Sequence, residues 1–309
     1  MNTNIKGIHH ITAIARNAKR NLDFYTRVLG LRLVKKTVNF DDPGTYHLYF
    51  GNEAGDPGTI LTFFPWEGMT QGRKGTGQVT ETAFAVPEGS LDFWKRRLDD
   101  EQVFFNNPYG RLNEKYLALL DPDSLKIELV ETRDTFVNPY QYAGIPKDFA
   151  IRGFHTATLA VRDYESTAAL LTSVFGYRFV EAEANRYRYS SGEKATGHLI
   201  DLVNLPFDAP GHVAGGSVHH IAFRTDSLES QLAIRQSLLN FGMQPTDQID
   251  RNYFMSVYFR EPQGILFEIA TDPPGFTIDE ELSSLGKTLK LPERYEAMRE
   301  RIETSLPVL

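Results

Sequence analysis

Two histidine doublets are the residues of this chain whose type and spacing could most readily do chemistry. His9 and His10 begin one apolar stretch, His219 and His220 begin another, and an isoleucine follows each doublet. The chain has no cysteine, which excludes a disulfide scaffold, a thiolate metal site, an iron–sulfur cluster and a thiol nucleophile. Any metal site must therefore use His, Asp or Glu.

The doublets belong to a short strand-like pattern that occurs four times, at intervals of roughly seventy residues. The four copies read GIHHITAIARN, GQVTETAFAVP, GFHTATLAVRD and GSVHHIAFRTD. Apolar residues at helical spacing follow each copy. In three copies this stretch ends at a glycine, as helix C-termini commonly do: Gly30, Gly176 and Gly242. Short β-rich segments with turns complete each copy, so we predict four βαβββ modules in an α+β protein.

The limits of the modules follow from these copies. The last two strands of each module read as a hairpin, and the segments DPDSLKIELVE and EPQGILFEIAT place Glu128 and Glu268 at equivalent positions. We expect a connection between the two halves at 132–150 and a C-terminal helical extension over 276–309. The modules are expected in two pairs, over 5–135 (approximately 5–70 and 76–135) and 150–275 (approximately 150–210 and 215–275).

The pattern resembles the vicinal oxygen chelate superfamily, which includes glyoxalase I, bleomycin-resistance proteins and extradiol dioxygenases. The resemblance covers roughly residues 5–275, and two motifs carry it. His10 precedes Phe24 of an Asp-Phe-Tyr motif by fourteen residues, and Glu268 lies in the strand-like LFEIA. The resemblance implies that the modules pair into two cupped, mixed β-sheet barrels. It also implies a divalent metal, with ligands at the start of the first strands and on the last strands.

Two sets of metal ligands fit these positions. One is His10, His220 and Glu268, and the other replaces His10 by His155, which opens the third copy. We favour His10, because only the first and fourth copies share the sequence His-His-Ile. The resemblance favours the same choice, since hydroquinone ring-cleaving dioxygenases of the superfamily take ligands from their first and last modules. We therefore propose that the first and fourth modules share the metal cup.

The second and third modules would then form another cup. Glu81, Glu128, His155 and Asp201 occupy the equivalent positions there. These side chains could hold a second metal. The alternative is that Lys, Arg or backbone donors neutralise the carboxylates.

Within the superfamily, the chain looks most like the dioxygenases that cleave hydroquinone-type (para-diphenol) rings. Two imidazoles and one carboxylate form the facial triad that suits non-heme Fe(II) and dioxygen. The resemblance therefore implies an extradiol-type ring-cleaving dioxygenase with Fe(II), although purified protein could carry zinc, nickel or manganese instead. Matching the subgroup pattern gives five catalytic candidates: His9, Thr12, His219, Arg251 and Tyr258.

These candidates have expected roles. His9 or His219 would shuttle a proton, while Arg251 and Tyr258 would orient the substrate or stabilise negative charge. Since side chains alternate along a strand, Thr12 should share the face of His10, whereas His9 should point away unless the strand is twisted.

Other functions remain open. The scaffold also supports glyoxalase-I-like, metal-dependent isomerisation, and some members bind aromatics or drugs without turnover. Retention of two histidines and a glutamate argues against a pure binding protein. Thr62 stands where the first module would carry an equivalent of Glu268, which argues against the four-ligand site of a glyoxalase.

The expected partners are small. A small aromatic substrate and O2 are the predicted partners, and the protein could form a homo-oligomer. The net charge of -7 gives no basic footprint for nucleic-acid binding. We see neither a signal peptide nor an apolar run long enough to span a membrane, so a cytoplasmic location is expected.

Overall fold

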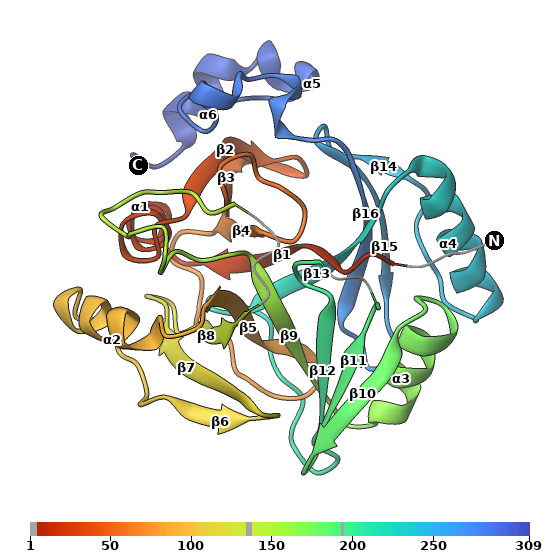
Figure 1. The fold of residues 1–309 in the computed structure, drawn as a ribbon. Helices are drawn as coiled ribbons and strands as arrows, with labels where there is room; N and C mark the ends of the chain where they lie inside the picture. Colours follow the sequence, from red (N-terminus) through yellow and green to blue (C-terminus); the bar gives the residue numbers. More distant parts are fainter. Residues whose placement is uncertain (1–4, 134–137, 193–194) are drawn as a thin grey trace.

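The computed structural model describes residues 5–133, 138–192 and 195–309, and it repeats one order of elements four times (Figure 1). The first module consists of β1 (Ile8–Ala15), α1 (Ala18–Asp23), the π-helical turn η1 (Phe24–Val28), β2 (Arg32–Asn39), β3 (Asp42–Gly51) and β4 (Ile60–Pro65). The second consists of β5 (Gln78–Pro87), α2 (Leu91–Asp100), β6 (Tyr109–Arg111), β7 (Glu114–Leu120) and β8 (Lys126–Thr132).

The second half of the chain has the same order of elements. The third module consists of β9 (Phe154–Val161), α3 (Tyr164–Ser173), β10 (Arg178–Glu183), β11 (Arg186–Ser190) and β12 (Leu199–Asn204). The fourth consists of β13 (Val218–Thr225), α4 (Leu228–Asn240), β14 (Ile249–Asp250), β15 (Phe254–Arg260) and β16 (Leu266–Pro274). The C-terminal segment adds η2 (Phe276–Ile278), η3 (Leu282–Ser284), α5 (Glu293–Glu296) and α6 (Arg299–Ser305).

The strands form two eight-stranded sheets, and each sheet combines one module from the first half of the chain with one from the second half. One sheet has the order β14-β15-β16-β13-β1-β4-β3-β2, and the other has the order β10-β11-β12-β9-β5-β8-β7-β6. The first and fourth modules therefore share one sheet, and the second and third share the other. Antiparallel pairs β1–β13 and β5–β9 join the modules, while β1–β4 and β13–β16 are parallel. The predicted architecture of two curved, mixed sheets is confirmed.

The alternation of side chains along β1 packs one face of this sheet against the hydrophobic core and turns the other face toward the cup. Ile11 and Ala13 face the main hydrophobic core, where they join residues such as Phe63 and Phe223. Side chains of successive strand residues point to opposite faces, so His10 and Thr12 face the inside of the cup. The register of β1 against β13 shifts between Ile8 and His10, which marks an irregularity at the start of the strand.

The helices begin and end close to their sequence signals. Asn17 caps α1 by accepting a hydrogen bond from the backbone nitrogen of Arg20. Gly30, Gly176 and Gly242 all adopt positive φ after their helices, a conformation that glycine reaches at little cost. The helix expected after β1 is divided, because α1 changes into the π-helical turn η1 at Phe24.

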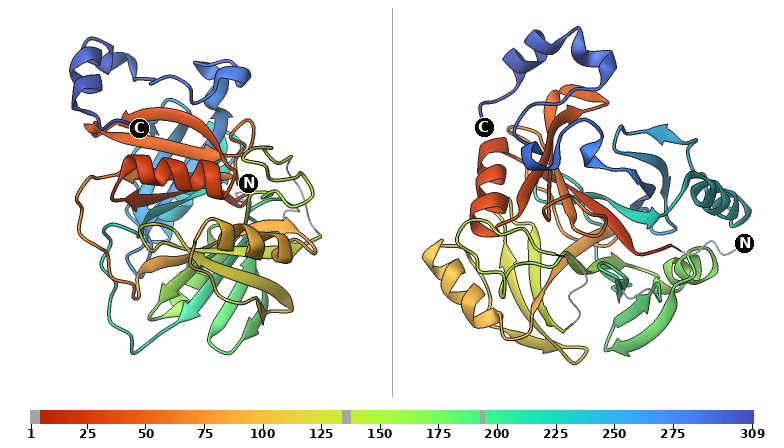
Figure 2. Two further views of the ribbon diagram at one scale, coloured as in Figure 1. Left: turned by 90° about the vertical axis from the view of Figure 1, so that its left-hand side faces the viewer. Right: turned by 45° about the horizontal axis from the view of Figure 1, so that its top comes forward.

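The C-terminal segment packs beside β2 and β3, at the edge of the first sheet (Figures 1 and 2). Leu291, Ile302 and Leu306 form a small apolar cluster with Val38 of β2. The ammonium group of Lys35, also on β2, is fully buried. It forms ion pairs with two carboxylates of this segment, those of Asp279 and Glu280.

Two further expectations concern the connection between the halves and the possibility of a membrane-spanning helix. The connection expected at 132–150 includes residues 134–137, which lie outside the described residues. Within the described ranges, no helix is both long and apolar enough to cross a bilayer.

Candidate metal centre

Three potential ligand atoms converge at the centre of the first sheet. The Nε2 atom of His220 lies 3.0 Å from Oε2 of Glu268, and Nε2 of His10 lies 3.3 Å from the same oxygen. The two Nε2 atoms are 3.4 Å apart. Among the residues that the structure describes, these three form the one group of His, Asp or Glu ligand atoms that all lie within 4.8 Å of one another.

The sheet register explains this convergence. His10 lies on β1 and His220 on β13, the antiparallel strands at the middle of the sheet. Strand β16 runs beside β13 with Glu268 opposite Ala222, two residues after His220. Residues two apart on a strand face the same side, so the carboxylate points into the cup beside both imidazoles.

The donor set fits a divalent metal. First-row metal–ligand bonds of about 2.0–2.2 Å place ligand atoms on adjacent octahedral positions about 3 Å apart, close to the observed separations. Oε2 of Glu268 is buried and accepts no hydrogen bond of good geometry, although Nε2 of His10 and Nε2 of His220 both face it. A buried carboxylate oxygen without a well-aligned donor is costly, and a bound cation would compensate it. Two imidazoles with one carboxylate are also the ligands of facial-triad iron sites.

The two imidazoles also favour the charged form of the Glu268 carboxylate. Burial by itself would raise the pKa of the Glu268 carboxyl, but the neighbouring His10 and His220 hold that pKa well below its usual range. Ser256 donates a hydrogen bond to the other carboxylate oxygen, Oε1, at 2.5 Å. The carboxylate is therefore ionised and oriented, with Oε2 left to face the two imidazoles.

A second histidine contacts each of the two candidate ligand histidines. Nδ1 of His9 lies 2.9 Å from Nδ1 of His10, and Nδ1 of His219 lies 2.8 Å from Nδ1 of His220. Such contacts on the far nitrogen fix the ring orientation of a metal-binding histidine. Burial, together with the neighbouring His220, lowers the pKa of His219 to about 3, so this ring is neutral at neutral pH. Burial also lowers the pKa of His9 well below its usual value.

Arg251 and Tyr258 lie together near His220. Nε of Arg251 donates to the Tyr258 hydroxyl oxygen at 3.3 Å, and the Tyr258 ring packs edge-on against His220 with centroids 5.8 Å apart. Asp41 holds the other end of Arg251 through an ion pair of 3.2 Å. Burial, followed by the charge of Glu268, raises the pKa of Tyr258, which keeps the phenol neutral.

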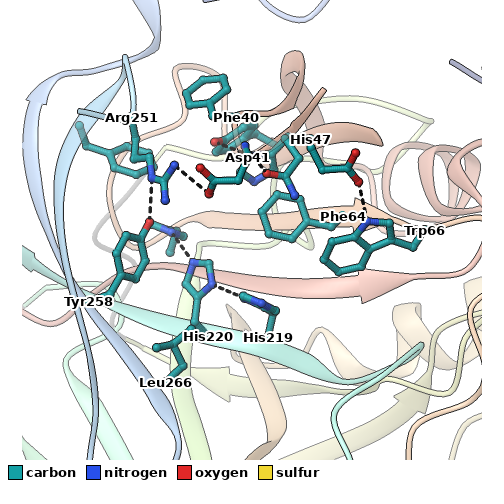
Figure 3. A pocket seen from close by; sticks show the side chains of 15 residues that line it. Phe40, Asp41, His47, Phe64, Trp66, His219, His220, Arg251, Tyr258 and Leu266 are labelled. Atoms are coloured by element: carbon teal, nitrogen blue, oxygen red, sulfur yellow. Dashed lines mark hydrogen bonds and ion pairs between the residues drawn. The ribbon is translucent and has the colours of Figure 1, made fainter. Parts of the chain in front are cut away.

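The site opens into a cavity of about 430 Å³, shown in Figure 3. His10, His219, His220, Arg251 and Tyr258 all line it. His9 and Thr12 are buried and are not among its lining residues, and the hydroxyl of Thr12 has no hydrogen-bond partner in the structure. The remaining wall is mainly aromatic and acidic: Asn39, Phe40, Asp41, Asp42, His47, Tyr49, Phe64, Trp66, Phe254 and Leu266.

The chain matches the family model described as the Glyoxalase/Bleomycin resistance protein/Dioxygenase superfamily over residues 7–129 and 153–269. The chain belongs to this superfamily. The family membership inferred from the sequence motifs is thus confirmed.

Two named relatives match this chain along nearly its whole length. It is 48% identical to "Putative ring-cleaving dioxygenase MhqO" of Bacillus subtilis (strain 168), over 97% of this chain and 95% of that protein. It is 33% identical to the chlorohydroquinone/hydroquinone 1,2-dioxygenase of Sphingobium indicum, over 96% of this chain and 95% of the relative.

Solved structures of other superfamily members agree with the fold. A crystal structure titled as a putative dioxygenase from Bacillus subtilis subsp. subtilis str. 168 is 46% identical and superimposes with a TM-score of 0.96, covering 99% of this chain and 98% of that one. Glyoxalase I from Zea mays gives a TM-score of 0.64 at 14% identity, with coverage of 86% and 92%, and so supports the fold alone.

The second sheet of this superfamily member carries ion pairs at the positions that correspond to the candidate metal ligands. Each candidate side chain there has a partner of its own. His155 contacts Glu114 at 2.8 Å rather than His220, which belongs to the other sheet. Cations neutralise the carboxylates: Arg111 pairs with Glu128, Arg188 with Asp201, and Lys126 and Arg186 with Glu81. Among the described residues, this second cup therefore contains a network of ion pairs and no group of three converging ligand atoms.

The sequence interpretation missed part of the site. Phe64, Trp66 and Phe254 were not among the predicted site residues, yet all three line the cavity. The prediction also omitted His47 and Asp41. Alternation along the segment GTYHLYFG could have identified His47, since it shares a strand face with Tyr49. Nothing in the sequence marks Asp41, whose role depends on a contact with Arg251 from a distant module.

Proposed function

We propose that this protein is a mononuclear non-heme Fe(II) dioxygenase that cleaves the ring of hydroquinone-type, para-diphenolic aromatics. The observation that carries the proposal is the facial arrangement of His10, His220 and Glu268 at the base of an aromatic-walled cavity. The names of the full-length relatives support the same reaction class. A bound Fe(II) would acidify a coordinated phenol and couple the electron-rich ring to dioxygen.

The cavity matches a single substituted ring. Phe64, Trp66 and Phe254 offer ring faces and edges against which an aromatic substrate can pack, and they limit access of water. A volume of about 430 Å³ is within the size range of small-molecule sites.

Polar groups in the wall would orient the substrate oxygens. Because Arg251 donates to the Tyr258 oxygen, the hydroxyl hydrogen of Tyr258 is free to donate to a substrate oxygen. The guanidinium group adds positive charge beside it, which stabilises negative charge that develops on the ring oxygen. The contact of Tyr258 with His220 and the hydrogen bond from Arg251 to Tyr258 support a role for both groups beside the proposed ligands.

His219 is the better placed of the two proton-shuttle candidates. Its ring lines the cavity. With Nε2 of His220 kept for the metal, Nδ1 of His220 carries its hydrogen and donates to Nδ1 of His219, so Nε2 of His219 carries a hydrogen that it can pass to a substrate oxygen. His9 is buried behind His10 and would act on orientation of that ligand instead.

The finer type of cleavage is part of the proposal. In an extradiol-type reaction, the broken carbon–carbon bond joins the hydroxyl-bearing carbon to a neighbour without a hydroxyl. Both atoms of O2 enter the ring-opened product, and no external reductant is consumed.

The test is an oxygen-uptake assay with methylhydroquinone on protein that has been loaded anaerobically with Fe(II). We expect one O2 consumed per ring opened, a new ultraviolet chromophore, and loss of both in His10→Ala but not in His155→Ala. Product analysis with ¹⁸O2 and mass spectrometry would locate the broken bond. Absence of uptake with any diphenol in iron-loaded protein would reject the dioxygenase and redirect the search to glyoxalase-type thiol adducts.

A further inference from the structure

The sheet that carries the ligands is pseudosymmetric. Its strand order reads the same from both edges, with β1 and β13 at the centre, β4 and β16 beside them, and β3 and β15 next. Thr12 pairs with Thr62 on β4, just as Ala222 pairs with Glu268 on β16. Thr62 therefore flanks His10 as Glu268 flanks His220.

The next strands extend this correspondence. Tyr49 on β3 pairs with Thr62, as Tyr258 on β15 pairs with Glu268. Two residues earlier on those strands stand His47 and Ser256. The hydrogen bonds correspond as well, because Ser256 binds the Glu268 carboxylate and His47 Nε2 binds the Thr62 hydroxyl.

The order of large and small side chains is reversed between the Ser256–Glu268 pair and the His47–Thr62 pair. One half combines a small serine with a long glutamate, while the other combines a large histidine with a short threonine. All four side chains are buried, so the histidine ring takes space that a longer side chain at position 62 would need. His47 is held on both ring nitrogens, since the Tyr49 hydroxyl lies 2.9 Å from its Nδ1. A phenol that donates to Nδ1 leaves Nε2 protonated, and Nε2 then donates to Thr62.

The position of His47 relates it directly to the ligand cluster. It lines the same cavity as His10 and His220, and its ring centroid lies 4.3 Å from that of Phe64 in the wall. Figure 3 shows His47 across the cavity from Tyr258 and Arg251. It does not belong to the group of ligand atoms that lie within 4.8 Å of one another.

We propose that His47 is a positioning residue that excludes a fourth protein ligand, keeping the metal face beside His10 open for an oxygen ligand. Sites with three protein ligands leave positions for exogenous molecules, whereas a fourth ligand closes one of them. The meaning of the open face rests on the proposed dioxygenase function. The placement of His47 does not depend on it.

The experiment is a double-mutant cycle in metal affinity. Metal-free full-length protein would be titrated with Co(II) against a competing chelator for the wild type, His47→Ser, Thr62→Glu and the double variant. The double variant copies the serine–glutamate pair of the other half. We expect it to bind Co(II) at least about tenfold more tightly, whereas Thr62→Glu alone gains much less because His47 still takes the space. General damage to the fold would not raise affinity.

The Co(II) absorption spectrum provides a second readout. Added azide should change the spectrum of the wild type but change that of the double variant much less, because the new carboxylate takes one open position. An equal affinity gain in Thr62→Glu and in the double variant would overturn the proposal. So would a double variant with wild-type affinity and a wild-type response to azide.

A separate pair of variants keeps the test valid if a glutamate at position 62 prevents folding. His47→Gln retains an amide that can hold Thr62, while His47→Ala removes both volume and hydrogen bond. We expect azide to bind the Co(II) protein at least about tenfold more weakly in His47→Ala, because the released Thr62 hydroxyl can then take the open position, and within about threefold of the wild type in His47→Gln. Identical affinities in all three proteins would contradict the proposal. None of these titrations uses a substrate, so failure of the ring-cleavage assay would reject the proposed function alone.

Discussion

Arg251 and Asp41 form an ion pair of 3.2 Å across the cavity, between the fourth module and the β2–β3 hairpin of the first. The same guanidinium reaches the Tyr258 hydroxyl through Nε and lies over the Tyr258 ring at 5.3 Å. Asp41 is mostly exposed, so its ion pair adds little to global stability. Its effect should instead be local, on the orientation of Arg251.

We therefore predict that Asp41→Asn raises the KM for a hydroquinone several-fold and leaves the melting temperature nearly unchanged. Steady-state oxygen-uptake kinetics and calorimetry would measure the two effects. Asp247→Asn is the matched control, because it removes an exposed carboxylate that pairs with Arg235 away from the cavity. An unchanged KM in Asp41→Asn would show that Arg251 needs no such support.

Tyr258→Phe should lower kcat by about 10²-fold, within the range for loss of one preorganised hydrogen-bond donor to developing charge. Metal affinity should remain as in the wild type, because Tyr258 is not among the ligand atoms. Single-turnover kinetics and a Co(II) titration would separate the two quantities. Tyr187→Phe, in the second sheet, serves as the control. A wild-type kcat in Tyr258→Phe would remove the phenol from the reaction.

Glu268→Gln and Glu128→Gln should affect different properties, metal affinity and folding stability, although the two glutamates stand at equivalent positions in different modules. Glu268→Gln should weaken Zn(II) or Co(II) binding by at least about 100-fold, because the amide loses the anionic ligand oxygen. Glu128→Gln should keep the metal affinity but lower the unfolding free energy by about 2 kcal/mol, since it removes the charge of a buried carboxylate that Arg111 and Lys126 neutralise. Chelator competition and urea unfolding of metal-free protein measure these outcomes. Loss of metal binding in Glu128→Gln would contradict the assignment.

The ion-pair network of the second cup should make stability sensitive to acid. Burial alone would raise the pKa of Glu114, but its hydrogen bond with His155 and the charge of Arg188 lower that pKa to about 2, from 4.5 in the unfolded chain. A carboxyl with a depressed folded-state pKa stabilises the protein above its unfolded pKa and loses this contribution as pH falls. The contribution of Glu114 should thus disappear between about pH 4.5 and pH 2.

Urea unfolding of metal-free protein across this pH range would test the prediction. Glu114→Gln should be less stable than the wild type near pH 6, and the difference should shrink as the pH approaches 2. A difference that stays constant with pH would mean that ionised Glu114 does not contribute through its charge.

The local pattern of the chain was sufficient for much of the fold. Repeated strand openings, helical spacing and glycine stops predicted the four modules, because they depend on side-chain periodicity and backbone freedom within a few residues. The motifs around His10, Phe24 and Glu268 identified the superfamily, which the family model confirms. The sequence offered two histidines that could join His220, because His155 opens the third module in the same register as His10.

By itself, then, the sequence determined the modules, the superfamily and a short list of candidate metal-binding side chains. Only the tertiary structure decided which of them meet. The pairing of β1 with β13 brings His10 to His220 across more than two hundred residues, and the second sheet leaves His155 with Glu114. The structure alone also showed that His47 and Ser256 occupy equivalent positions in the two halves of the pseudosymmetric sheet. Strand pairing between distant modules sets these contacts, and the local periodicity of a chain does not encode such long-range register.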